Sequence, residues 1–406
     1  MEWKEVTLGE VSSKIGDGLH GTPKYDDEGS YYFINGNNLN CGKIIIKDDT
    51  KRVGIEEFVK NQKELNEQTI LVSINGTIGN VAKYNNEPCI LGKSACYINV
   101  IKEVDKEFIY YVLTSANFKR NITNEATGTT IKNVSLKQMR EYKFNIPCNI
   151  SDQRRIAFIL SSLDRKIELN NKINADLEEM AQAIFKNWFV DFEPFKGGKF
   201  VDSELGMIPE GWKVGRADDF YQINIGKTPP RKENKWFSTN PADKIWVSIA
   251  NMGNSGIFIS DSSEYLTKEA VDRHNIIMVP RNTILLSFKL TVGRVAIADK
   301  ELTTNEAIAR FILSDDKYME YLYLYLKNFD YNSLGSTSSI ATAVNSKTIK
   351  GMQMLQPSDK IIDAFHIQVN PIFEKIRSLT KENSRLSLLR DTLLPRLMSG
   401  ELEVPE

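Results

Sequence analysis

Thr69-Ile-Leu-Val-Ser-Ile-Asn-Gly-Thr-Ile-Gly-Asn-Val-Ala82 aligns without a gap with Thr283-Ile-Leu-Leu-Ser-Phe-Lys-Leu-Thr-Val-Gly-Arg-Val-Ala296, an offset of 214 residues. Other landmarks recur in the same order at offsets between about 206 and 214 residues, because surface loops gain and lose residues while the elements between them persist. These landmarks are Trp3 with Trp212, Thr22-Pro23 with Thr228-Pro229, Asn38 with Asn251, and Ile131, Leu136 and Met139 with Val344, Ile349 and Met352. The chain is therefore predicted to contain two diverged copies of one domain.

Each copy is expected to be a mixed domain of short strands and helices. In the first copy, runs rich in β-branched and aromatic residues between Gly and Asn turns predict strands at residues 31–35, 43–47, 69–74 and 96–101. Residues 107–113 are predicted to be helical. A glycine-containing loop at residues 75–79 follows the strongest strand, and its counterpart is at residues 289–293, where the first glycine is lost.

A long helix is predicted after each copy. Residues 151–189 contain neither Pro nor Gly, and Ser151 is the expected N-cap. Positions that step by 4 and 3 form a coiled-coil seam; they are Ile156, Leu160, Leu163, Ile167, Asn170, Asn174, Leu177, Ala181, Ile184 and Trp188. The second seam is Phe365, Val369, Ile372, Ile376, Leu379, Asn383, Leu386, Arg390, Leu393 and Leu397. We predict an α+β protein in which two similar mixed α/β domains are separated by two long antiparallel coiled-coil helices, with pseudo-twofold symmetry.

Two features of the seams have alternative interpretations. Asn174 and Asn383 correspond in the repeat, and they either fix the register as buried polar residues or face solvent. Pro371 interrupts the second seam, so it either kinks the helix mildly or marks a fresh start with Asn370 as the cap.

Composition excludes several classes of protein. With 41% hydrophobic and 26% charged residues and no apolar run of roughly 18 residues, we expect a cytoplasmic protein without a membrane span or signal peptide. The four cysteines and three histidines are scattered, so we expect neither disulfides nor a metal site. A net charge of −1 gives no global attraction to a polyanion, so any DNA binding must depend on local features.

The sequence also lacks the motifs of a nucleic-acid-modifying enzyme. It has no Asn/Asp-Pro-Pro-aromatic motif and no glycine-rich S-adenosylmethionine loop after a strand. Gly92-Lys-Ser94 and Gly226-Lys-Thr228 end like a P-loop but lack its first glycine, and are interpreted as turns. We therefore expect no catalytic residue and no cofactor.

Several stretches resemble the specificity subunit of a type I restriction-modification enzyme. They are Ala181-Gln-Ala-Ile-Phe-Lys-Asn-Trp-Phe-Val-Asp-Phe192, Leu389-Arg-Asp-Thr-Leu-Leu-Pro-Arg-Leu-Met-Ser-Gly-Glu-Leu402, Gly128-Thr-Thr-Ile-Lys-Asn-Val-Ser135 leading through Pro147 to Gln153-Arg-Arg-Ile156, and Ile208-Pro-Glu-Gly-Trp-Lys213. The second copy departs modestly, with Ala-Thr-Ala-Val-Asn at 341–345 and no basic run at 359–366.

The resemblance implies a non-catalytic DNA-binding subunit. Residues 1–150 and 193–358 would be two target-recognition domains, and residues 151–192 and 359–406 the conserved long helices. Such a subunit reads a bipartite, asymmetric sequence of double-stranded DNA. It holds two adenine-N6 methyltransferase subunits and, in the full complex, two restriction subunits. The alternative is a stand-alone two-lobed DNA-binding or scaffold protein without a methyltransferase partner.

Polar residues on the repeat loops are the candidates for DNA contact. Asn pairs bidentately with adenine, and Lys or Arg with guanine, whereas the alternative for each Asn is that it satisfies a turn. The candidates are Asn37, Asn38, Asn75, Thr77, Asn80, Lys132 and Asn133 in the first copy, and Asn251, Lys289, Thr291, Arg294, Asn345 and Lys347 in the second.

An apolar cluster near the ends of the helices is the candidate subunit interface. It consists of Phe185, Trp188, Phe189 and Phe192 with Leu394 and Leu397. Part of it is interpreted as a docking face for methyltransferase helices. Packing within the chain's own core is the alternative.

Overall fold

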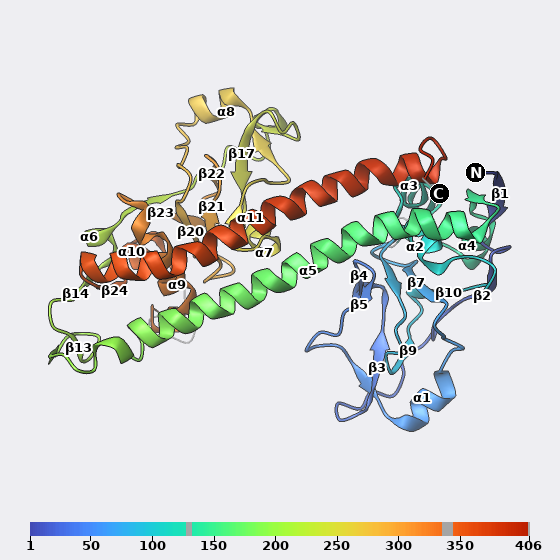
Figure 1. Cartoon of the computed structure of the whole chain (residues 1–406), viewed down its shortest axis with the longest axis horizontal. Helices are drawn as coiled ribbons and strands as arrows, with labels where there is room; N and C mark the ends of the chain where they lie inside the picture. Colours follow the sequence, from blue (N-terminus) through green and yellow to red (C-terminus); the bar gives the residue numbers. More distant parts are fainter. Residues whose placement is uncertain (127–131, 335–343, 405–406) are drawn as a thin grey trace. The chain divides into compact units, whose positions relative to one another are not determined.

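The computed structural model in Figure 1 describes residues 1–126, 132–334 and 344–404. The chain divides into two compact units. Unit 1 consists of Met1–Glu168 and Ser384–Glu406, and unit 2 of Leu169–Asn383. The division falls within the long helices α5 (Ile150–Phe189) and α11 (Asp359–Met398), so each unit contains part of both helices.

Unit 1 is built on a four-stranded antiparallel sheet in the order β2-β10-β7-β8. Its strands are Ser12–Asp17, Ala95–Val100, Thr69–Ser73 and Val81–Lys83. Smaller sheets are β6-β3-β9 (Arg52–Val53, Tyr31–Ile34, Cys89–Leu91), β4-β5 (Leu39–Asn40, Lys43–Ile44) and β1-β11 (Trp3–Thr7, Lys143–Pro147). The helices are α1 (Ile55–Asn61), α2 (Lys106–Thr114), α3 (Ala116–Glu125) and α4 (Leu136–Glu141).

Unit 2 is built on a five-stranded sheet in the order β15-β23-β20-β21-β18. Its strands are Gln222–Ile225, Ile308–Ile312, Ile284–Ser287, Val295–Ala298 and Phe258–Ile259. The other sheets are β16-β19-β17-β22 (Phe237–Ser238, Tyr265–Leu266, Lys244–Val247, Thr303–Thr304), β14-β24 (Lys213–Arg216, Gln353–Gln356) and β12-β13 (Phe200–Val201, Ile208–Pro209). The helices are α6 (Ala217–Phe220), α7 (Ile249–Asn254), α8 (Lys268–Arg273), α9 (Met319–Asn328) and α10 (Ser346–Lys350).

The two units share one topology. The order β2-β10-β7-β8 matches β15-β23-β20-β21, and the ribbon β1-β11 matches β14-β24. In both units the aligned repeat forms a hairpin, β7-β8 in unit 1 and β20-β21 in unit 2. The predicted duplication and the mixed α/β class are confirmed.

Most of the elements predicted for the first copy are present within about one residue of the expected ends. The strand predicted at 43–47 is wrong beyond Ile44, because a tight hairpin at Cys41 and Gly42, both with positive φ, limits β5 to two residues. The chain then turns away, and the Ile45 side chain is exposed.

The long helices differ from the prediction at two points. Helix α5 begins at Ile150, and the Asn149 Oδ1, rather than Ser151, caps it by accepting the Ser151 backbone N–H at 2.9 Å. Helix α11 runs through Pro371, so the predicted fresh start is wrong. Pro371 leaves the Ile367 carbonyl without its helical donor, and both residues lie on the exposed side of α11.

Within each unit the two helices pack antiparallel. In unit 2, the Asn170 Nδ2 donates to the Asn383 Oδ1 at 2.9 Å. Phe185 follows Asn170 by 15 residues on α5, and Phe365 precedes Asn383 by 18 residues on α11. The ring centroids of these two phenylalanines are 6.3 Å apart, so the helices run in opposite directions. In unit 1, the Arg390 Nη1 donates to the Asp164 Oδ1 at 2.7 Å. The buried seam partner of Asn383 is therefore Asn170, which is fully buried, and the half-buried Asn174 does not make that bond.

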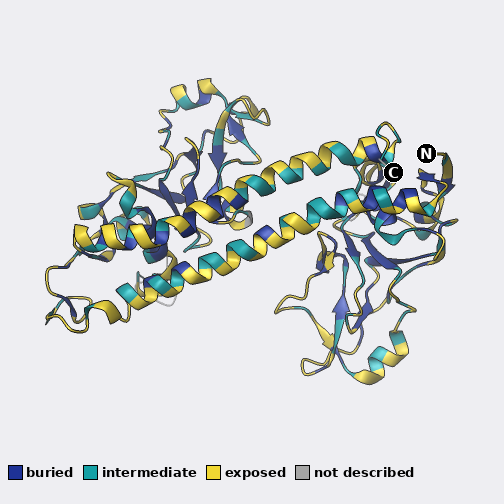
Figure 2. Ribbon diagram, in the orientation of Figure 1, coloured by how far each residue is buried: buried dark blue, intermediate teal, exposed yellow. Residues whose placement is uncertain are grey.

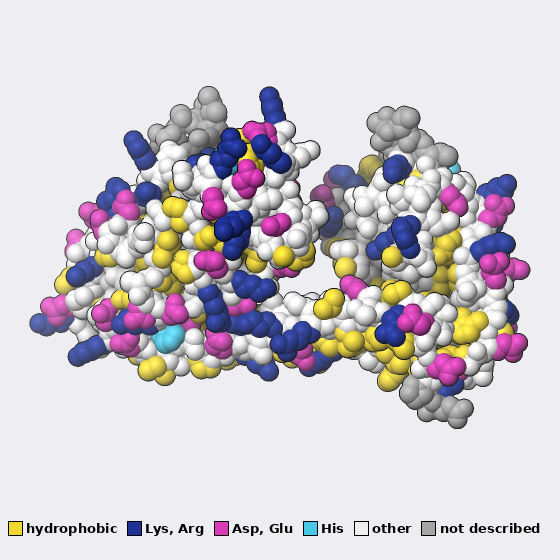
Figure 3. All heavy atoms as spheres, turned by 90° about the horizontal axis from the view of Figure 1, so that it is seen from above, with side chains coloured by type: hydrophobic (Ala, Val, Ile, Leu, Met, Phe, Trp, Pro, Cys, Tyr) yellow, Lys and Arg dark blue, Asp and Glu magenta, His cyan; other side chains and the backbone are white. Residues whose placement is uncertain are grey.

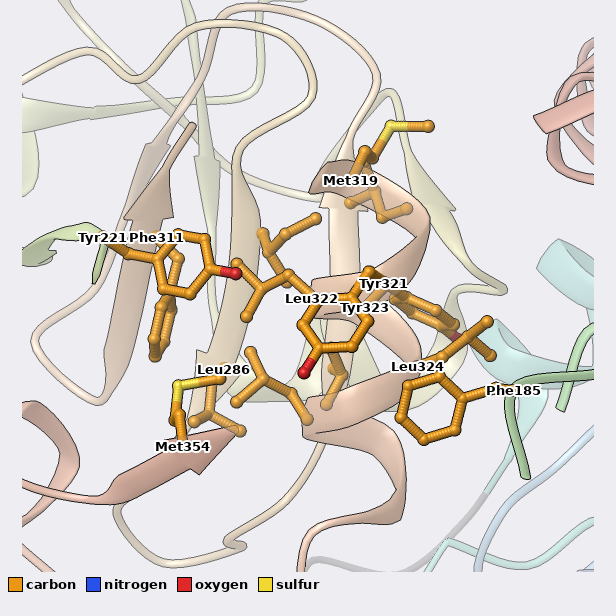
Figure 4. Close-up of a cluster of buried hydrophobic side chains, with 14 of the residues drawn as sticks. Phe185, Tyr221, Leu286, Phe311, Met319, Tyr321, Leu322, Tyr323, Leu324 and Met354 are labelled. Atoms are coloured by element: carbon orange, nitrogen blue, oxygen red, sulfur yellow. The ribbon is translucent and has the colours of Figure 1, made fainter. Parts of the chain in front are cut away.

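Burial concentrates on the strands and on the inner faces of the helices (Figure 2). The core of unit 2 surrounds α9, where Leu286 of β20, Tyr321 of α9 and Phe185 of α5 belong to one cluster (Figure 4). Among the helices in the described ranges, none is both long and apolar enough to span a bilayer.

Candidate nucleic-acid interface

The loop between β7 and β8 is organised by one buried serine. The Ser73 Oγ accepts the Asn80 backbone N–H at 2.9 Å and donates to the Thr77 carbonyl. The Ser73 carbonyl accepts the Gly79 N–H at 2.9 Å. Gly76 and Gly79 have φ values of 75° and 86°, a left-handed conformation that glycine adopts without steric cost. The loop is therefore a fixed frame that presents residues 75–78.

The loop between β20 and β21 has the same frame. The Ser287 Oγ donates to the Thr291 carbonyl at 2.6 Å and accepts the Arg294 N–H at 3.0 Å. The Ser287 carbonyl accepts the Gly293 N–H at 3.0 Å. Sequence reasoning missed the role of Ser73 and Ser287. Their signal was that both serines occupy the same position in the aligned repeat.

In unit 1 the loop lies beside a second predicted segment. The Asn75 Nδ2 donates to the Asn133 Oδ1 at 3.1 Å, and the Gly76 N–H donates to the Lys132 carbonyl at 3.1 Å. The structure thus brings Asn75, Lys132 and Asn133 together, with the Thr77 and Lys132 side chains exposed. Residues 127–131, which include part of the motif at 128–135, lie outside the described residues.

In unit 2 the loop packs against other elements. The Arg294 Nη1 donates to the Ile249 carbonyl of α7 at 2.7 Å, so part of this guanidinium has a structural role. The Tyr331 ring lies beside Gly293, and burial raises the pKa of the Tyr331 hydroxyl. The side chains of Lys289 and Thr291 remain exposed.

Three predicted asparagines hold turns. The Asn38 Oδ1 accepts the Asn35 N–H at 3.0 Å, and the equivalent Asn251 Oδ1 accepts the Ser248 N–H at 2.9 Å. Asn38 is 5% exposed, and its Nδ2 donates to the Ile45 carbonyl at 3.1 Å. The Asn345 Oδ1 caps α10 by accepting the Lys347 and Thr348 N–H groups. For these residues the structure supports the turn interpretation, because their amides are engaged by the backbone.

The remaining candidates divide by exposure. The exposed ones are Asn37, Thr77, Lys132, Lys289, Thr291 and Lys347, and the half-buried ones are Asn75, Asn80, Asn133 and Arg294. Acidic and basic side chains are interspersed on the face shown in Figure 3, in keeping with the net charge near zero. Contact with DNA would therefore depend on these loops rather than on a broad positive field.

The apolar cluster predicted as a subunit interface lies mostly inside the chain's own cores. Phe185 and Phe189 are 2% and 5% exposed in unit 2, where Phe189 packs against Phe365 with ring centroids 4.8 Å apart. Leu397 is 3% exposed in the core of unit 1. Trp188, Phe192 and Leu394 are half-buried against the same two cores. Burial removes Phe185, Phe189 and Leu397 from any docking face.

Among the described residues, no group of three or more His, Cys, Asp or Glu side chains is placed to hold a metal ion. Of the cysteines, Cys89 and Cys96 are buried, whereas Cys41 and Cys148 are exposed. Burial raises the pKa of the Cys89 thiol to about 12, which keeps it in the unreactive protonated form.

The chain is similar to known proteins in both sequence and fold. The specificity subunit of the type I restriction enzyme HindI of Haemophilus influenzae is 28% identical over 360 residues, covering 73% of this chain and 77% of that protein. The MjaIX specificity subunit of Methanocaldococcus jannaschii is 29% identical over 397 residues, covering 95% of this chain and 87% of that protein. Specificity subunits are the non-catalytic components of type I restriction systems.

Among solved structures, the S subunit of the type I restriction-modification system of M. genitalium superposes with a TM-score of 0.57 at 18% identity, over 98% of this chain and 96% of that one. It therefore shares the fold. The family model for the type I restriction modification DNA specificity domain matches residues 1–179 and 209–366. Because those two matches cover most of the chain and coincide with its two copies, the chain belongs to the type I restriction-modification DNA specificity family.

Proposed function

We propose that this chain is the DNA-reading subunit of a type I restriction-modification complex and recognises a bipartite, asymmetric target. Residues 1–150 would read one half of the target and residues 193–358 the other. The observation that carries the proposal is the shared loop frame of the two units, which presents different side chains at equivalent positions: Asn75 in unit 1 corresponds to Lys289 in unit 2. Because Asn pairs with adenine and Lys or Arg with guanine, two such loops favour unlike half-sites.

An exchange of domains tests this division. Residues 1–150 are replaced by the corresponding domain of another family member, and the hybrid is expressed with its methyltransferase subunits. Sequencing of methylated adenines in host DNA then gives the target. We expect one half of the motif to change while the other half stays the same. A change in both halves, or in neither, would contradict the proposal.

The proposed protein partners are two adenine-N6 methyltransferase subunits and, in the full complex, restriction subunits. A candidate surface for such a contact is a groove of about 870 Å³ in unit 1. Its lining includes the apolar side chains of Val112, Phe144, Leu394 and Met398, and charged side chains of both signs, Lys119, Arg120 and Lys143 with Glu5 and Asp391. Leu394 is the member of the predicted interface cluster that lines this groove, so it keeps its proposed role in docking.

Co-purification tests the docking proposal. Leu394→Arg introduces a charge among the apolar side chains of the groove and is expected to abolish recovery of the methyltransferase subunits with the tagged chain. The matched control is Leu205→Arg, at a leucine that is 46% exposed in unit 2. Circular dichroism of the free chain would check that both variants fold. Normal recovery with Leu394→Arg would rule out this groove.

The second candidate is a stand-alone two-lobed DNA-binding or scaffold protein. It differs from the first proposal in one measurable respect, because it would bind duplex DNA without a methyltransferase. Failure of any adenine methyltransferase to co-purify with the wild-type chain, together with sequence-specific binding by the chain alone, would favour it.

A further inference from the structure

The tip of the unit 2 loop carries a leucine in a conformation suited to glycine. Leu290 has a φ of 62°, and Gly76, at the equivalent position of the unit 1 loop, has a φ of 75°. The left-handed region brings the Cβ of an L-residue close to the following carbonyl oxygen, so leucine is strained there and glycine is not. The two loops therefore share a backbone conformation at this position, and only the second loop places a branched apolar side chain there.

The Leu290 side chain does not pack into the protein core. It is 100% exposed, although the neighbouring Phe288 is 1% exposed. An exposed leucine alone is ordinary on a protein surface. A strained and fully exposed leucine gains no folding energy in return for its strain, and such strain occurs most often at functional sites.

The surroundings of Leu290 are suited to DNA. The flanking side chains, Lys289 and Thr291, are also exposed, and they supply an ammonium group and a hydroxyl for phosphates or base edges. The loop backbone is held by the Ser287 Oγ and by the Gly293 N–H. Because this frame already fixes the tip, a contact there costs little conformational entropy on binding.

We propose that Leu290 is a specificity-determining residue that contacts the methyl group of a thymine in the half-site read by residues 193–358. This inference rests on the proposed DNA-reading function. The thymine C5-methyl group is the apolar feature that base pairs display in the major groove, and small apolar side chains recognise it. Gly76 has no side chain for such a contact, so the recognition is confined to one half of the target.

The test replaces thymine by uracil, which lacks only that methyl group. The assembled complex with its methyltransferase subunits is first used to define the methylated motif. Duplexes are then made with deoxyuridine at one thymine position at a time, and their binding is measured. We expect deoxyuridine at one position in the half-site of residues 193–358 to weaken binding about fourfold. This factor corresponds to losing the burial of one methyl group.

The Leu290→Gly variant tests whether the effect of uracil depends on the Leu290 side chain. Glycine keeps the loop conformation, and the variant is expected to bind the thymine and uracil duplexes at that position equally. Deoxyuridine in the other half-site serves as the control, since Leu290→Gly should leave its effect unchanged. Thermal unfolding of the variant excludes misfolding as the cause, because removing the strain should not lower the midpoint.

The outcomes separate the two proposals. A complex without sequence-specific methylation would overturn the proposed function itself. Specific methylation of a motif whose corresponding half-site has no A·T pair, or shows no uracil effect, would overturn the role of Leu290 alone. If Leu290→Gly instead weakens binding to the thymine duplex and to the uracil duplex by the same factor, Leu290 would act as an apolar wedge between base steps. That result would also overturn the methyl contact.

Discussion

In unit 2 the long helices supply nine buried residues to the main core, whereas in unit 1 they supply four. The nine are Ala181, Phe185, Phe189, Ile362, Phe365, Val369, Ile372, Phe373 and Ile376, and the four are Ile156, Ala157, Leu160 and Leu397. Most of the core of unit 1 comes from its strands and from α2 and α3, through residues such as Ile70, Phe108 and Phe118. Duplication preserved the fold of the domain, but the stability of unit 2 has become more dependent on the helices.

The largest expected effect comes from removing one helix aromatic. Phe365 is fully buried and contacts Phe185, Trp188 and Phe189. Phe365→Ala should lower the free energy of unfolding by about 3–5 kcal/mol, since it removes a large side chain and leaves a cavity. Urea unfolding followed by tryptophan fluorescence measures this, because four of the five tryptophans, all but Trp3, lie in unit 2.

The matched substitution in unit 1 is Leu160→Ala, expected to cost about 2–3 kcal/mol, and Phe158→Ala, at a phenylalanine that is 64% exposed, is the control. A larger loss for Leu160→Ala than for Phe365→Ala would reverse the comparison between the units.

The second comparison concerns the ionic contacts that α11 makes within each unit. Asp299 is 3% exposed and lies 3.0 Å from the Arg377 Nη1, 3.5 Å from the Arg281 Nε and 3.4 Å from the Lys381 Nζ. Asp164 is 31% exposed, pairs with Arg390 and accepts a hydrogen bond from the Tyr111 hydroxyl at 2.7 Å. Asp299→Asn takes the Asp299 carboxylate away from the buried Arg377 guanidinium and should lower the free energy of unfolding by about 3 kcal/mol.

Asp164→Asn should cost about 1 kcal/mol, because solvent screens the partly exposed pair. Thermal unfolding of the two variants at low and high salt measures the difference. The destabilisation caused by Asp164→Asn should shrink at high salt, whereas the destabilisation caused by Asp299→Asn should depend little on salt. Equal destabilisation by the two substitutions would mean that burial does not distinguish the two contacts.

The sequence predicted the architecture well because duplication and periodicity are both local signals. The repeat, the two helical seams and the helix at α2 were predicted from the sequence, whereas the hairpin β7-β8 was predicted only as its first strand and loop. The partner of Asn383 was not predicted, because equivalence in the repeat identifies Asn174 as its counterpart but does not give its contacts, and antiparallel packing selects Asn170. The sequence also left two alternatives open at Pro371, and only the fold shows that α11 continues through it.

Prediction of the candidate site was limited for a different reason. An asparagine in a loop is suited equally to reading adenine and to capping a turn, and only the structure shows that Asn38, Asn251 and Asn345 bond to backbone groups. Ser73 and Ser287 were overlooked because a serine at the end of a strand has no distinctive sequence pattern. Its function is apparent only when the loop closes around it.

A smaller effect should distinguish the loops in their binding to DNA. Lys132 and Lys289 are exposed at the loops of units 1 and 2. If each contacts a phosphate, Lys132→Ala and Lys289→Ala should each weaken binding several-fold and reduce the slope of log affinity against log salt by about 0.9. Titrations of the assembled complex on target DNA at several salt concentrations measure the slope. An unchanged slope combined with altered half-site preference would show a base contact instead.

The smallest expected effect concerns the two loop tips in the absence of DNA. Leu290→Gly should raise the free energy of unfolding by about 0.5–1 kcal/mol, because glycine removes the left-handed strain but adds freedom to the unfolded chain. Gly76→Leu should lower it by a similar amount. Since no atom lies within 4 Å of the position that a Cβ would take at Gly76, we attribute the cost of Gly76→Leu mainly to the backbone conformation. Differential scanning calorimetry should show shifts of about 2–4 °C per kcal/mol in opposite directions. Shifts of the same sign would mean that contacts of the leucine side chain, rather than the shared backbone conformation, set the stability of the loops.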